Sequence, residues 1–195
     1  MTKFITSPII REEVIISDKN DSFLRHLDFY ESDLNIYTRN VDVYLINSDQ
    51  KIFIIKNHPK DSVYPRYFGP ARGFVKWEDL TEAVEDNGTC YFNAARRVLE
   101  QKLGLEIEPE MLNLIHKISP DKNYKKDWYG IIIAKSNLRP LPHPLYTIPS
   151  KCGFYSLNEL SQLISHKSCV DTLKYIFDFK RSKGVVRREL ERIIR

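Results

Sequence analysis

The acidic stretch at residues 78–86 holds the side chains of this sequence that best suit metal chemistry. Its candidate ligands are Asp79, Glu82, Glu85 and Asp86. Carboxylate oxygens are preferred ligands of Mg²⁺ and Mn²⁺, so the stretch predicts a metal site if the protein is an enzyme. The alternative is a solvated, charged loop, because nothing in the sequence fixes three of these carboxylates around one point.

A second group of residues suits the binding of a phosphate and a base. Arg66 and Arg72 flank the aromatic residues Tyr67 and Phe68. Arginine makes forked hydrogen bonds to phosphate, and an aromatic ring stacks on a base. The group predicts a nucleotide-like ligand, with solvated loop arginines as the alternative. The histidines and the three cysteines lack metal-ligand spacing, and the odd cysteine number favours a reducing, cytoplasmic location.

Hydrophobic periodicity predicts the elements that position these residues. Apolar residues at steps of three and four indicate a helix over 89–103, capped by Thr89 and ended by Gly104. The runs 41–47 and 51–57 surround a short polar break, which predicts a β-hairpin. Further strands are expected at 73–75, 112–118, 128–134 and 153–155, and further helices at 21–32, at 78–86, after a capping box of Ser156 and Glu159, at 169–179 and at 185–195. This order favours a mixed α/β domain.

Length and charge limit the domain organisation. The 195 residues have the size of one domain, and a hydrophobic fraction of 42% allows a packed core. We expect no membrane span and no secretory signal. The formal net charge is +4, and residues 180–195 hold seven basic and two acidic residues, so the rest is nearly neutral. We expect an N-terminal extension at 1–36, a main domain at 37–180 and a basic C-terminal helix at 181–195.

The sequence from Gly73 onward resembles the signature of the Nudix hydrolases, in which a glycine, a glutamate and an Arg-Glu helix have fixed spacing. The matching residues are Gly73, Ala94, Ala95, Arg97, Leu99, Gly104 and Leu105. The Tyr-Pro-x-Tyr-Phe stretch at 64–68 and the start Arg39-Asn40-Val41 resemble the subgroup similar to isopentenyl-diphosphate isomerase. The resemblance implies a Nudix-like α/β/α sandwich with a mixed sheet in a single domain.

The family places three metal-binding carboxylates on one face of the signature helix, and this sequence departs from that pattern. With Gly104 as the anchor, their positions hold Val98, Gln101 and Lys102. Two like unit charges about 4 Å apart repel by roughly 4 kcal/mol at an effective dielectric near 20, and a divalent ion doubles that. We therefore expect no metal cofactor, with Mg²⁺ or Mn²⁺ only if carboxylates elsewhere replace the lost ones.

The spacing before the helix also departs from the signature. Arg97 follows Gly73 by 24 residues instead of 14, so the segment between them is ten residues longer. Asp79 stands where the first glutamate is expected, and we expect it to pair with Arg97 as a structural remnant. Glu100 either takes a catalytic role or forms a surface ion pair with Arg96.

Three functional hypotheses follow. The first is a catalytically impaired Nudix-fold protein that binds a nucleoside-diphosphate-type ligand or a protein partner, with Lys102 neutralising phosphate in place of metal. Its candidate ligand-binding residues are Arg66, Tyr67, Phe68, Arg72, Arg97 and Lys102. The second is an active hydrolase of nucleoside-diphosphate-linked substrates, with catalytic Asp79, Glu82, Glu85 and Glu100 and a metal held by the 78–86 stretch. The third is an RNA-associated or assembly subunit, in which the helix at 184–195 contacts RNA; that helix can instead pack on the body or form a homodimer.

Overall fold

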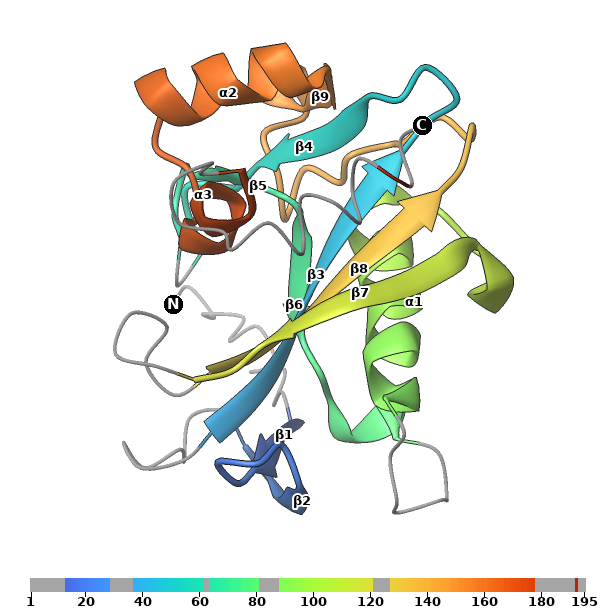
Figure 1. The fold of residues 1–195 in the computed structure, drawn as a ribbon, viewed down its shortest axis with the longest axis vertical. Coiled ribbons are helices and arrows are strands. Elements are labelled where there is room, and N and C mark those ends of the chain that lie inside the picture. The colour runs from blue at the N-terminus through green and yellow to red at the C-terminus, as the bar shows by residue number, and fades with distance from the viewer. Residues whose placement is uncertain are drawn as a thin grey trace, which may run out of the picture.

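The computed structural model describes residues 13–28, 37–61, 64–80, 88–120, 127–177 and 192. Nine strands form one mixed sheet, which helix α1 covers on one face and helices α2 and α3 on the other (Figure 1). This arrangement confirms the predicted α/β sandwich with a mixed sheet. Among the described helices, none has the length and apolar character that a bilayer span requires.

Strand β3 (Tyr37–Ile46) is the centre of the sheet. One edge pairs in parallel with β8 (Asp127–Lys135) along nine residues. The other edge pairs in turn with β1 (Glu13–Ser17), β6 (Ala71–Phe74) and β4 (Ile52–Lys56). The remaining strands are β2 (Phe23–Asp28) beside β1, β5 (Phe68–Gly69) and β9 (Gly153–Tyr155) beside β4, and β7 (Leu112–Ile118) beside β8.

Both strands of the predicted hairpin are confirmed, but they pair with each other over a short stretch only. Only Leu45 with Phe53 and Ile46 with Ile52 face each other across β3 and β4. Beyond these pairs the strands separate, and β6 takes the place of β4 at the edge of β3. The end of β4 pairs instead with β5, whereas β9 pairs with Ile52–Ile54 along the other edge of β4.

Helix α1 (Thr89–Leu103) has the bounds that its periodicity predicts. Its apolar side chains Tyr91, Ala95 and Leu99 are fully buried against the sheet. Gly104 ends the helix at a left-handed φ of 62°, as expected, and its N–H returns to the carbonyl of Glu100. The predicted Thr89 cap is wrong: Thr89 is the first helical residue, and Gly88 with φ of 94° is the N-cap.

The C-terminal helices agree with their sequence signals. Helix α2 (Leu157–His166) begins at the predicted capping box, in which Ser156 and Glu159 exchange hydrogen bonds. Helix α3 (Asp171–Phe177) lies within the predicted range 169–179. Short 3₁₀ turns occur at Trp77–Asp79, Pro109–Met111 and Pro149–Lys151. The predicted helix at 185–195 lies outside the described residues apart from residue 192.

The helix predicted at 21–32 is wrong for the residues that the structure describes, since Phe23–Asp28 form strand β2. The reason is the turn before it. The Asp18 carboxylate accepts hydrogen bonds from the N–H groups of Asn20 (2.7 Å) and Ser22 (2.9 Å), and Asp21 has a φ of 66°. This turn reverses the chain, and antiparallel pairing with β1 satisfies the backbone groups that a helix would otherwise satisfy internally.

Alternation along the strands divides the core into two layers. Val41, Val43 and Leu45 of β3 face α1, whereas Tyr44 and Ile46 face α2 and α3. By the same alternation, Arg39 lies on the α1 face of β3 and Asp42 lies on the face of α2 and α3.

Candidate functional site

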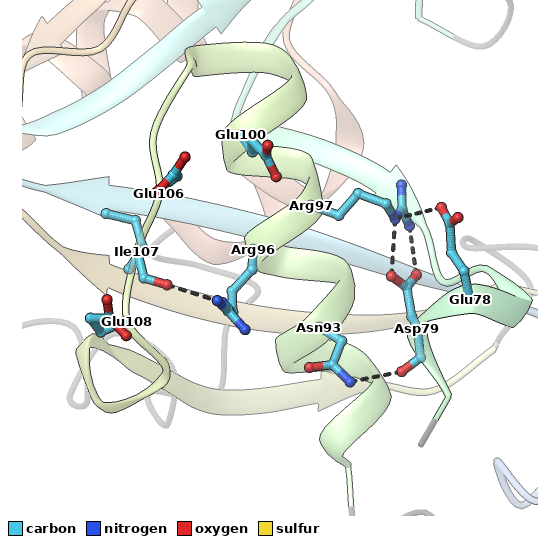
Figure 2. Close-up of a pocket in the computed structure, with 9 residues that line it drawn as sticks. All are labelled: Glu78, Asp79, Asn93, Arg96, Arg97, Glu100, Glu106, Ile107 and Glu108. Atoms are coloured by element: carbon cyan, nitrogen blue, oxygen red, sulfur yellow. Dashed lines mark hydrogen bonds and ion pairs between the residues drawn. The ribbon is translucent and has the colours of Figure 1, made fainter. Parts of the chain in front are cut away.

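A pocket of about 590 Å³ opens along α1, between the turn at Trp77–Asp79 and the segment that follows the helix (Figure 2). Its lining is mostly charged. The lining residues are Glu78, Asp79, Asn93, Arg96, Arg97, Glu100, Glu106, Ile107 and Glu108. Asn93, Arg96, Arg97 and Glu100 recur at steps of three and four, so they share one face of the helix.

The predicted pair of Arg97 with Asp79 is confirmed. Arg97 Nε donates to Asp79 Oδ1 at 3.0 Å and Nη2 donates to Oδ2 at 2.6 Å. Nη2 also donates to the carbonyl of Phe74 at 2.7 Å, and the N–H of Lys76 donates to Asp79 Oδ2 at 2.7 Å. Asp79 is only 3% exposed. The pair therefore fixes the turn before α1 to the helix and to the end of β6.

The other side of the pocket is formed by Arg96. Its Nε donates to the carbonyl of Ile107 at 3.1 Å, which ties the helix to the segment after it. The predicted Arg96–Glu100 ion pair is not formed between these described residues. Glu100 is exposed at the pocket rim, on the same helix face as Arg97 (Figure 2). Its catalytic role stays a prediction.

The three residues at the positions that the Nudix resemblance assigns to metal-binding carboxylates have different surroundings. Val98 is 2% exposed, and its Cγ2 lies 2.5 Å from where a Cβ on Gly73 would stand. Gln101 is exposed, and Lys102 is half-buried with its Nζ 6.0 Å from the centre of the Tyr146 ring. The first position is thus used for packing against β6, and the third carries a cation.

The Pro-rich crossing at 139–149 covers the C-terminal turn of α1. The N–H of Leu141 donates to the carbonyl of Leu103 at 2.8 Å, and the N–H of His143 donates to the carbonyl of Lys102 at 2.8 Å. These bonds satisfy carbonyls that a helix end leaves open. The crossing therefore closes the end of the helix with backbone donors.

These residues do not fit a divalent cation. Valine offers no ligand atom, and both carboxylate oxygens of Asp79 already accept bonds from Arg97. Within the described ranges, no three histidine, cysteine or acidic side chains come close enough to hold a metal ion together. Glu82, Glu85 and Asp86 lie outside the described residues, so the hypothesis that they supply a metal site stays a prediction.

Arg72, a predicted ligand contact, lies on the other face of the sheet in an ion pair with Asp42. Nε donates to Asp42 Oδ1 at 2.6 Å and Nη2 donates to Oδ2 at 2.7 Å. Thr172 of α3 bonds both partners, and the rings of Tyr64 and Tyr129 lie 4.9 and 5.0 Å from the guanidinium carbon. Burial alone would lower the pKa of Arg72, but the Asp42 carboxylate outweighs it and raises that pKa.

The remaining predicted contacts are at a third place, in the edge strand β5 and in the turn just before it. Arg66 is exposed with φ of 61°, Tyr67 is half-buried against Tyr64, and Phe68 is buried under the Lys56 side chain. The six predicted ligand-binding residues thus do not form one site. Their binding roles stay predictions, to be assigned to separate surfaces.

Sequence reasoning missed a buried network around Asp21, which is 7% exposed at its side chain. Arg39 Nε donates to Oδ1 at 2.8 Å, Lys117 Nζ donates to Oδ2 at 2.7 Å, and the Tyr91 hydroxyl lies 3.1 Å from Oδ1. The network joins the β1–β2 turn to three other elements. The signal that points to it is Arg39 just before the run that begins at Val41, because a charge in a buried strand needs a partner.

No model of a known protein family matches the sequence, and no curated protein matches it. Solved structures do match its fold. DR0079 from Deinococcus radiodurans is similar with a TM-score of 0.67 at 16% identity, over 88% of this chain and 100% of that one. A Nudix hydrolase from Alicyclobacillus acidocaldarius has a TM-score of 0.59 at 8% identity, over 83% and 97%. A MutT Nudix hydrolase from Burkholderia pseudomallei has 0.52 at 19%, over 72% and 95%. The chain therefore has the Nudix hydrolase fold.

Proposed function

We propose that this protein is a Nudix-fold binding protein with impaired hydrolysis, which recognises a nucleoside-diphosphate-type ligand or a protein partner. The observation that supports the proposal most directly is which residues stand on the metal-binding face of α1. Val98 is packed onto Gly73 and Lys102 brings a cation, at positions where metal-dependent relatives need carboxylates. A divalent ion at this turn would meet one apolar and one positively charged side chain.

The Arg97–Asp79 pair supports the same proposal. It keeps the signature arginine in a structural role, so the scaffold of the helix survives without its metal ligands. The hypothesis of an active hydrolase takes its metal ligands from the 78–86 stretch. Among those candidate ligands the structure describes Asp79, and the pair with Arg97 already occupies its carboxylate. Freeing Asp79 for a metal would leave the Arg97 guanidinium, which is 14% exposed, without its main partner.

Calorimetric titration with ADP-ribose tests the proposal, once with EDTA and once with Mn²⁺. The proposal expects binding of similar affinity under both conditions and no turnover of a panel of phosphoanhydrides. Binding or turnover that needs Mn²⁺ would contradict it and would favour the active hydrolase. In that case the double variant Glu82→Gln with Glu85→Gln should lose the Mn²⁺-dependent binding and turnover, and the control variant Lys135→Gln should retain both.

The variant Gln101→Glu with Lys102→Glu restores two of the three family carboxylates. If α1 lacks only its ligands, the variant should bind Mn²⁺ more tightly than the natural protein. Turnover by the natural protein that does not rise in this variant would contradict the proposal. Thermal unfolding of both proteins checks that the substitutions leave the fold intact.

A further inference from the structure

Three cations gather on the face of the sheet that α1 does not cover. Strand pairing sets Lys56 of β4 opposite Phe68 of β5, and Phe68 is bridged in parallel to Cys169. Two backbone bonds of 2.9 Å, from the N–H of Phe68 to Ser168 and from the N–H of Val170 to Phe68, hold this register. Arg66 stands two residues before Phe68 and Lys167 two residues before Cys169, so both basic residues belong to the segments that pair next to Lys56.

The surroundings of the Lys56 side chain agree with this register. The Lys56 ammonium lies 3.9 Å from the centre of the Phe68 ring. Its pKa is lowered, first by burial and then by repulsion from Lys167 and Arg66, although the nearby Cys169 acts in the opposite sense. Like charges held together in this way lower the free energy cost of bringing in an anion.

No described carboxylate neutralises the charges of this cluster. Among the residues that the structure describes, neither Lys56 nor Arg66 nor Lys167 forms an ion pair. The acid that α3 contributes nearby, Asp171, pairs with Lys174 at 3.5 Å. This differs from Arg72 and Arg97, each of which has a carboxylate partner. Arg66 and Lys167 are exposed, so a ligand can reach them from solvent.

We propose that Lys56, Arg66 and Lys167 form a binding site for the phosphate groups of a small phosphorylated ligand. A guanidinium offers two parallel donors to phosphate, and the two ammonium groups add charge-assisted hydrogen bonds. Tyr67 follows Arg66 in the sequence and is half-buried, with its ring centre 5.7 Å from that of Tyr64, so we expect it to contact the rest of the ligand. Strand β5 lies beside α3, on the other side of the sheet from α1 (Figure 1), so this site is separate from the α1 pocket on which the proposed function rests.

Pyrophosphate is the probe that tests the site, titrated by calorimetry into the full chain with EDTA present. Arg66→Gln and Lys167→Gln should each weaken binding by about tenfold, and the double variant by more. The matched control is Lys135→Gln, an exposed lysine at the end of β8, which should bind as the natural protein does. Raising the salt concentration should weaken binding, because the contacts are ionic.

Two results would overturn the proposal. One is no pyrophosphate binding by the natural protein in the millimolar range. The other is equal binding by the double variant. Binding of long RNA or polyphosphate without pyrophosphate would also contradict a site for a compact ligand. Lys167 follows the end of α2, where a cation stabilises the helix, so a purely structural role would lower the thermal midpoint and leave affinity unchanged. Turnover assays on the same variants keep this test separate from the one on α1.

Discussion

Two arginine–aspartate pairs with forked hydrogen bonds lie on opposite faces of the sheet in the described part of the chain, and their surroundings differ. Arg97 and Asp79 border an open pocket, where the exposed Glu78 also lies 3.3 Å from Arg97. Arg72 and Asp42 are enclosed by Thr172 and two tyrosine rings. The α1 face thus keeps a charged cleft with water access, whereas the other face uses its pair to attach α3 to the sheet.

The charged residues on the two faces of the sheet therefore make different contacts. On α1, Arg97 connects the helix to the turn at Trp77–Asp79 and to the carbonyl of Phe74 in β6. On the opposite face the Arg72–Asp42 pair is enclosed, and three described cations without an ion pair stand at its edge, in β4, in the turn before β5 and in the turn before α3. We therefore expect the second phosphate site at this edge and not at the enclosed pair.

Breaking the enclosed pair should have the largest effect on stability. Asp42→Ala leaves the Arg72 charge buried, since that side chain is only 13% exposed, and should lower the free energy of unfolding by about 3–5 kcal/mol. Urea denaturation measures the change. The control is Asp42→Leu with Arg72→Met, which removes both charges and should recover most of the loss. A change below about 1 kcal/mol in Asp42→Ala would contradict the account.

Breaking the pair at the pocket should cost less. Arg97→Met removes the bonds to Asp79 and to the Phe74 carbonyl, and water from the pocket can solvate the carboxylate that is left. We expect a loss of about 2–3 kcal/mol. Arg96→Met on the same helix is the matched control, with an expected loss of at most about 1 kcal/mol because Arg96 is exposed and bonds one carbonyl. Equal losses in the two variants would show that the Asp79 pair has no special role.

The contact between Gly73 and Val98 should be the next in size. Gly73→Ala places a methyl group 2.5 Å from Val98 Cγ2 and should lower stability by about 1–3 kcal/mol. Val98→Ala removes the obstructing methyl groups. The double variant should therefore be less destabilised than the sum of the two single variants, and strict additivity would contradict close packing at this position.

His116 should have the smallest effect, visible only in the pH dependence of stability. Burial lowers the pKa of His116 below its ordinary value of about 6.5. Below that value the unfolded chain binds the proton first, so stability falls as the pH decreases. His116→Gln should flatten the profile of thermal midpoint against pH. A natural profile without this acid-side decrease would contradict a lowered pKa for the half-buried His116.

Much of the fold could be predicted from local sequence signals. The bounds of α1, the box at Ser156 and the strands at 112–118 and 128–134 follow from periodicity and capping, which act over a few residues. For Phe23–Asp28 the sequence predicts a helix because its apolar residues stand at steps of three and four, whereas the Asp18 turn and pairing with β1 make it a strand.

The site was less predictable, because its contacts join distant parts of the chain. The motif spacing indicated Arg97 with Asp79, but no local pattern links Arg72 to Asp42 and Thr172, which lie 30 and 100 residues away. A charged residue within the apolar run of β3 signals that a partner exists without saying which one. The cluster at Lys56 likewise depends on two strand registers that the sequence does not encode locally.

The central claim is that α1 no longer provides a site for a divalent cation. Paramagnetic resonance of Mn²⁺ titrated into the full chain tests it most directly, because free and bound ions give separate signals. We predict that the natural protein leaves Mn²⁺ free in solution and that Gln101→Glu with Lys102→Glu binds it. Tight Mn²⁺ binding by the natural protein, unchanged by the two substitutions, would contradict the account.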